Sequence, residues 1–173
     1  IIMKYQQLIN DLLTIPLKTI EILSAFIGSA LLRGLIVGFM TYLTAIFFVD
    51  FHYISIPVII SGSILVSLFF GFFGFLIGLW ANEFDRQTFI QNFILMPLIF
   101  FGGVFYPISS LPQNLQTIST FNPIFHMINL IRYGFTGVTE FPLPTSFIIL
   151  ISGCVFLFTL DYFLLKKGWR LKN

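Results

Sequence analysis

Charged residues are scarce in this 173-residue chain, in which Lys and Arg number 9 and Asp and Glu number 7. Charged residues make up 9% of the chain and hydrophobic residues 57%. A soluble domain carries about 25% charged residues, so a soluble globular fold is excluded. Disorder is excluded as well, because disordered chains are poor in aromatic residues and this chain is 18% aromatic. The composition predicts a protein whose main solvent is lipid.

Side chains that carry catalysis are equally few. The one cysteine, Cys154, has no partner for an intrachain disulfide, and the two histidines, His52 and His126, lie far apart in the chain. Glu140 and Asp161 stand alone rather than as a carboxylate pair. The chain has no glycine-rich loop of the kind that holds ATP phosphates, and no basic stripe for nucleic acid. We therefore predict a protein that is not an enzyme and binds no metal or cofactor of its own.

Four stretches are long and apolar enough to cross a bilayer, which takes about 20 residues. They cover roughly residues 24–49, 54–81, 89–106 and 146–165. Backbone groups in lipid must be paired internally, and the alternation typical of barrel strands is not visible, so the stretches are predicted to be helices. The fold class is an all-α membrane protein with four spanning helices. Because the sequence opens with Ile-Ile-Met-Lys, we expect the front of the protein to be missing.

The basic residues favour one side of the membrane. If the N-terminal end is cytoplasmic, seven of the nine fall in inside segments: Lys4, Lys18, Arg86, Lys166, Lys167, Arg170 and Lys172. Arg132 falls outside and Arg33 within the first span. Since positive residues accumulate on the cytoplasmic side, both ends of this chain are predicted to lie in the cytoplasm.

Small residues recur at four-residue spacing in the first two spans. Gly34 and Gly38 lie in the first, Gly74 and Gly78 in the second, and Gly71 continues a ladder of two serines. This spacing lets membrane helices pack closely. Glycine is also simply common in membrane helices. We favour close packing, more strongly for the second span than for the first.

The segment before the first span predicts a short cytoplasmic helix. Pro16 suits the first turn of a helix, Leu17 and Ile20 share one face, and Lys18 and Glu21 lie on another. Such a helix can serve as an interfacial anchor or as a docking element for a cytosolic partner. The spacing alone favours the anchor.

Two further polar features each have two interpretations. Arg33, well inside the first span, marks either a specific ion pair or function, or a side chain that extends its charge to the headgroups. Glu83, Asp85 and Arg86 form a charged cluster after the second span. We favour a solvated inner turn for this cluster, with a partner contact as the alternative.

Residues 107–144 are too polar for further clean spans. Asn122 followed by Pro123 is typical of a helix start. The polar residues after it share one face at helical spacing: His126, Asn129, Arg132 and Tyr133. Apolar residues oppose them, so the pattern predicts an amphipathic helix within a re-entrant or surface hairpin on the outer side.

Several ordered motifs together resemble the signature of ABC type-2 exporter permeases. They are the stretches 80–85, 92–93, 97–98, 101–107, 111–112, 122–128 and 131–135, together with 31–35 and the tail 167–171. The run from Gly102-Gly103 to Pro107 and the Asn122-Pro123 pair are the more specific elements. Gly102-Gly103 departs from the Ser-Gly of many members, which does not threaten the assignment.

The resemblance implies six spans, of which this chain would hold the last four. It also implies two permease copies, expected as a homodimer in membrane lipid, and two cytosolic ATPase subunits that bind ATP and Mg. A coupling helix would occupy residues 12–23, with contacts from Thr14, Ile15, Pro16, Leu17, Lys18, Thr19, Ile20 and Glu21. This replaces the anchor interpretation, and the outer hairpin would be the re-entrant pair of the family.

The leading functional hypothesis is therefore the permease subunit of an ATP-driven exporter in the bacterial inner membrane. Its cargo would be an amphiphilic, lipid-linked, glycan or drug-like molecule. The alternative is an ATP-independent channel or structural membrane subunit. A secondary transporter ranks lowest, because ion coupling calls for charges near the midplane and the second span has none.

Overall fold

The computed structural model describes residues 18–49, 54–81 and 84–167, and these residues contain helices and turns but no strand. The helices are α3 (Thr19–Ala45), α4 (Ile56–Trp80), α5 (Phe84–Ile90), the π-helix η1 (Gln91–Leu95), α6 (Met96–Phe100), the 3-10 helix η2 (Ile108–Ser110), α7 (Gln113–Thr120), α8 (Pro123–Thr136) and α9 (Leu143–Lys166). The predicted all-α class is confirmed for the described part of the chain.

Three helices are long and apolar enough to cross a membrane. They are α3, α4 and α9, with 27, 25 and 24 residues. Proline lies in the first turn of both α4 and α9. Backbone N–H groups in the first turn have no hydrogen-bond partner within the helix, so a proline there costs no helical hydrogen bond. These helices correspond to the first, second and fourth predicted spans.

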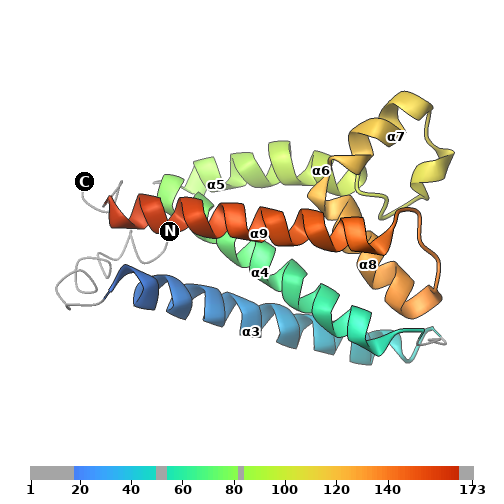
Figure 1. The fold of residues 1–173 in the computed structure, drawn as a ribbon, viewed down its shortest axis with the longest axis horizontal. Coiled ribbons are helices and arrows are strands. Elements are labelled where there is room, and N and C mark those ends of the chain that lie inside the picture. The colour runs from blue at the N-terminus through green and yellow to red at the C-terminus, as the bar shows by residue number, and fades with distance from the viewer. Residues whose placement is uncertain (1–17, 50–53, 82–83, 168–173) are drawn as a thin grey trace.

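The third predicted span has a different structure. Instead of one helix over residues 89–106, the segments α5, η1 and α6 follow one another without a break from Phe84 to Phe100. At 1.5 Å per residue they reach about 25 Å, somewhat less than the hydrocarbon core. Figure 1 shows them as one rod along the long axis of the molecule. The structure therefore contains three full-length candidate spans in its described residues rather than four.

The long helices pack around two apolar clusters. In the first, Leu23 and Ile27 of α3 meet Phe72 of α4 and Leu157 of α9. In the second, α8 packs against α4 and α9, with Leu130 and Leu150 among the buried residues. Helix α4 thus contacts α3, α8 and α9, and lies between them.

The two ends of this bundle differ in character. The turn after α6, η2, α7, α8 and the loop before α9 form one end, which we call the helical cap (residues 101–142; Figure 1). At the opposite end α3 begins and α4 and α9 end. This end carries the described lysines and one arginine, Lys18, Arg86, Lys166 and Lys167, and we call it the basic end.

The glycines divide into two groups. A Cβ on Gly34 would lie 2.6 Å from Oγ of Ser67, and one on Gly71 would lie 3.3 Å from Cβ of Ala30. These two glycines therefore allow α3 and α4 to approach closely, as small residues do between membrane helices.

The other predicted packing glycines have no such contact within the described residues. A Cβ on Gly38, Gly74 or Gly78 would meet no atom within 4 Å. Gly74 and Gly78 instead line a groove of about 300 Å³, opposite Gln87 and Gln91. For Gly74 and Gly78 the structure replaces the expected helix contact with an open groove between α4 and α5–η1.

Candidate functional site

The helical cap contains a buried polar network that begins at the start of α8. The side chain of Asn122 accepts a hydrogen bond from the N–H of Ile124 at 3.0 Å and so caps α8. Its Nδ2 donates to the carbonyl oxygen of Leu98 at 2.6 Å. That carbonyl lies in the last turn of α6, where carbonyls lack a helical partner. Asn122 therefore joins the end of α6 to the start of α8, directly before Pro123.

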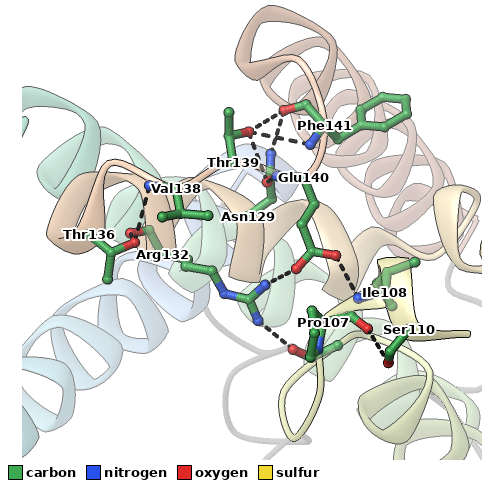
Figure 2. A network of polar contacts seen from close by, with 11 residues as sticks. Pro107, Ile108, Ser110, Asn129, Arg132, Thr136, Val138, Thr139, Glu140 and Phe141 are labelled. Atoms are coloured by element: carbon green, nitrogen blue, oxygen red, sulfur yellow. Dashed lines mark hydrogen bonds and ion pairs between the residues drawn. The ribbon is translucent and has the colours of Figure 1, made fainter.

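Arg132 on α8 lies at the centre of the network. It forms an ion pair with Glu140, and its Nη2 donates to the carbonyl oxygen of Gly103 at 2.5 Å. The second carboxylate oxygen of Glu140 accepts from the N–H of Ile108 at 2.5 Å. Figure 2 shows Glu140 between Arg132 and Ile108. One charge pair thus ties α8, the loop before α9, the turn after α6 and the start of η2.

Asn129, one turn before Arg132, holds the loop before α9. Its Oδ1 accepts from the N–H of Glu140 at 3.0 Å and from the hydroxyl of Thr139 at 3.1 Å. Its Nδ2 donates to the carbonyl oxygen of Phe141 at 2.9 Å (Figure 2). This side chain uses both its donor and its acceptor on the loop, so the loop has a fixed position over α8.

His126 continues the network toward α9. Its Nε2 lies 2.8 Å from the carbonyl oxygen of Thr120, which only accepts, so Nε2 carries the proton. Nδ1, 3.1 Å from Oγ of Ser146, then accepts from that hydroxyl, and Ser146 in turn accepts from Asn129. Burial lowers the pKa of His126, although the bond to Thr120 opposes this. A neutral imidazole is the form that fits these partners.

Two glycines shape the turn on which Arg132 acts. Gly103 has a φ of +80°, a conformation that other residues rarely adopt. A Cβ on Gly102 would lie 2.9 Å from Cγ2 of Ile124 and 3.1 Å from the carbonyl oxygen of Leu98. Glycine at both positions lets the chain turn after α6 and lie against α8. Pro107 then directly precedes η2.

The predicted amphipathic helix lies where α8 is found, but its polar face is not open to solvent. His126 and Asn129 are 0% and 2% exposed, and Ser146 is fully buried. The loop before α9 covers this face with hydrogen-bonding groups of its own. Glu140 and Ser146 belong to the network although the sequence pattern did not single them out as site residues. A carboxylate shortly after a helix that carries an unpaired arginine is the signal that could have indicated Glu140.

At the basic end, part of the predicted coupling helix can be described. Residues 14–17 lie outside the described residues. Lys18 precedes α3, and Thr19, Ile20 and Glu21 form its first turn. The N–H of Lys18 donates to Oε2 of Glu21 at 2.9 Å. Glu21 lies in the first turn of α3, where the helix dipole favours an acidic side chain. Residues 19–23 thus belong to the same helix as the first span.

The remaining predicted charged residues are exposed. Arg33 lies on the exposed surface of α3 and has no ion pair with any described residue. Asp85 and Arg86 lie in the first turns of α5, with the Arg86 guanidinium 5.8 Å from the ring centre of Trp80. Glu83 lies outside the described residues. The structure does not bring Arg33, Asp85 or Arg86 into the cap network.

Asp161 of α9 is a buried carboxyl that sequence reasoning set aside. It is fully buried, and neither carboxyl oxygen has a hydrogen-bond partner among the described residues. Leu157 and Leu165, one turn away on either side, belong to the cluster with α3. Unpaired carboxyls are costly in an apolar interior, so this position is a source of local instability in the bundle.

Comparison with known proteins identifies the family. Residues 1–136 match the family described as "ABC-2 type transporter". The chain belongs to this family. Among the described residues, no group of three or more His, Cys, Asp or Glu residues could hold a metal ion. Its family and its three helices that are long and apolar enough to cross a membrane make the chain an integral membrane protein.

Individual relatives of this ABC-2 chain support the assignment. It is 35% identical to the inner membrane transport permease YadH of Escherichia coli K12 over 170 residues, which is 98% of this chain and 66% of the relative. It is 28% identical over 86 residues to nodulation protein J of Rhizobium leguminosarum bv. viciae, which is 50% of this chain and 33% of the relative. The chain thus spans slightly less than two thirds of YadH. No solved structure matches it.

Proposed function

We propose that this chain is most of the membrane subunit of an ATP-driven exporter. It would work as one of two permease copies with two cytosolic ATPase subunits, which bind ATP and Mg. The cargo would be an amphiphilic molecule, a lipid-linked molecule, a glycan or a drug-like molecule. Membership of the ABC-2 family supports a transport role, and the cargo and partners are our proposal.

The observation that carries the proposal is the continuity of the basic end with the first span. Glu21 and Leu23 are separated by less than one turn of α3, and Leu23 is 1% exposed in the cluster with α4 and α9. A force applied at residues 18–21 would therefore act on a long helix whose inner face packs against both other spans. This is the mechanical link that an ATPase partner needs.

The orientation is proposed from the same arrangement. All described basic residues apart from Arg33 and Arg132 lie at the basic end. We place this end in the cytoplasm, by the positive-inside rule, and the helical cap on the outer side. ATP-driven closure of the partner would then shift the permease pair between two conformations with different ATP affinity.

Charge reversal at the start of α3 tests the coupling role. The full permease is reconstituted with its ATPase partner, and ATP hydrolysis and cargo transport are measured for Lys18→Glu/Glu21→Lys. We expect transport to fall at least tenfold while the protein inserts normally. Asp85→Asn/Arg86→Gln, exposed charges at the same end, is the control.

Unchanged cargo-stimulated hydrolysis and transport in Lys18→Glu/Glu21→Lys would refute the coupling role. Flux that persists without nucleotide would refute an ATP-driven exporter and favour the channel. Insertion is checked directly, by comparing the amounts of Lys18→Glu/Glu21→Lys and of Asp85→Asn/Arg86→Gln recovered in the membrane.

A further inference from the structure

A groove opens at the basic end between the start of α3 and the last part of α9. It has a volume of about 550 Å³ and is lined by Lys18, Thr19 and Ile20 of α3 and by Phe158 and Tyr162 of α9. Its walls therefore combine two aromatic rings and an aliphatic side chain with an ammonium group and a hydroxyl. The residues that line it come from the ends of two candidate spans.

The charges around the groove favour an anion. The Lys166 ammonium lies 5.9 Å from the centre of the Tyr162 ring, so a second positive charge adjoins the groove. Lys167 follows it on the exposed end of α9. Glu21 is the nearest carboxylate in the described part of α3, and it already accepts from the Lys18 N–H. Asp161 is fully buried and does not line the groove.

An apolar stripe leads away from the groove along α9. Ile151, Val155, Phe158 and Tyr162 follow one another at spacings of four, three and four residues, which places them on one face of a helix. The first three are between 36% and 59% exposed. From Tyr162 to Ile151 the helix rises about 16 Å, close to half of the ~30 Å hydrocarbon core. The stripe therefore matches the depth of one leaflet.

We propose that this groove binds an anionic phospholipid of the inner leaflet. The phosphate-bearing headgroup would lie between Lys18 and Lys166, and one acyl chain would follow the stripe toward Ile151. Basic pockets between spans on the cytoplasmic side are recurring sites for acidic headgroups. The inference rests on the proposed orientation, which places the basic end at the cytoplasmic face.

Native mass spectrometry of the full permease in detergent tests the headgroup contact. The probes are dioleoyl phosphatidylglycerol and dioleoyl phosphatidylcholine, titrated separately. We expect Lys18→Gln and Lys166→Gln each to weaken phosphatidylglycerol binding about fivefold, which corresponds to about 1 kcal/mol per lysine. Binding of phosphatidylcholine should be weak and unchanged. Arg86→Gln, a matched loss of charge at the same end, should have less than a twofold effect.

Equal loss with Arg86→Gln, or equal binding of phosphatidylcholine, would overturn the proposal, because attraction would then be non-specific. The readout requires no ATP, so it fails independently of the coupling role. Size-exclusion profiles of each variant show whether it is folded before binding is scored.

A second measurement locates the acyl chain without altering the lysines. In a background in which every tryptophan of the full permease, Trp80 and Trp169 included, is replaced by Phe, Val155→Trp places an indole on the stripe. Phe156→Trp places one at the same depth off the stripe. In vesicles of equal phosphatidylglycerol and phosphatidylcholine, only the phosphatidylglycerol is brominated. We expect at least twofold stronger quenching at position 155. Equal quenching at the two positions would refute the path along the stripe.

Discussion

The ion pair of the helical cap gives the sharpest prediction. The Arg132 and Glu140 side chains are 25% and 13% exposed, so water screens the pair only in part. Glu140→Gln keeps the shape but gives one oxygen site an NH₂ group that faces either Arg132 or the Ile108 N–H. Hydrogen bonds to charged groups contribute about 1.5–3 kcal/mol, and partial exposure reduces this. We expect a loss of about 1–2 kcal/mol.

The magnitude translates into a measurable melting shift. At roughly 2–4 °C per kcal/mol for a chain of this size, Glu140→Gln should lower Tm by about 2–8 °C. Cys154 is buried between α9 and α4, so its reaction with a thiol-reactive fluorescent maleimide during heating reports opening of the bundle. Asp85→Asn and Lys167→Gln, which remove exposed charges, should shift Tm by less than 1 °C.

A double-mutant cycle isolates the interaction energy between Arg132 and Glu140 from the energies of their other contacts. Arg132→Gln alone should cost about as much as Glu140→Gln, and the double variant should cost less than the sum by about 1 kcal/mol, as contacting residues do. Strict additivity, or Tm values within 1 °C of the unaltered protein, would refute the reasoning. In that case the contacts of Figure 2 would be energetically negligible.

Three further variants can be followed with the same melting assay. Gly102→Ala places a Cβ 2.9 Å from Ile124, and overpacking should cost about 1–3 kcal/mol; an unchanged Tm would show that the turn relaxes. Because burial lowers the pKa of His126, the folded state binds fewer protons than the unfolded state below about pH 6.5. Stability should therefore fall from pH 7.5 to 5.5, and His126→Gln should flatten that profile. Asp161→Leu removes two carboxyl oxygens without a described partner and should raise Tm, whereas a lower Tm would reveal a partner outside the described residues.

Hydropathy predicted the long spans because lipid imposes a minimum length on them. It could not find where the third predicted span stops being helical. Phe101, Val104 and Phe105 keep the sequence apolar beyond Phe100, where α6 ends. The break comes from backbone geometry, with Gly103 at a φ of +80°, and hydropathy does not register such a turn.

Periodicity located α8 but not its environment. The start at Asn122-Pro123 and the separation of polar from apolar residues were both readable. A helical period separates two faces, yet it does not say what covers each of them. The polar face is covered by residues 139–146, whose hydrogen bonds to Asn129 and His126 depend on the path of a loop. That path is set by the ion pair of Arg132 with Glu140.

The contacts between helices define how the two ends of the molecule communicate. Among the described residues, α3 packs mainly against α4 and α9, and α8 packs against the same two helices. Helices α3 and α8 also meet directly, where the rings of Tyr42 and Phe135 stack with their centroids 6.2 Å apart. Helix α9 carries Ser146 of the cap network at one end and Tyr162 of the groove at the other, about 24 Å apart along its axis. A displacement of α3 at the basic end can therefore reach the cap through α4 and α9, or along α3 itself to the contact of Tyr42 with Phe135. Since packed helices shift as units rather than deform continuously, we expect a shift of α9 to move α8 through the hydrogen bond between Ser146 and His126.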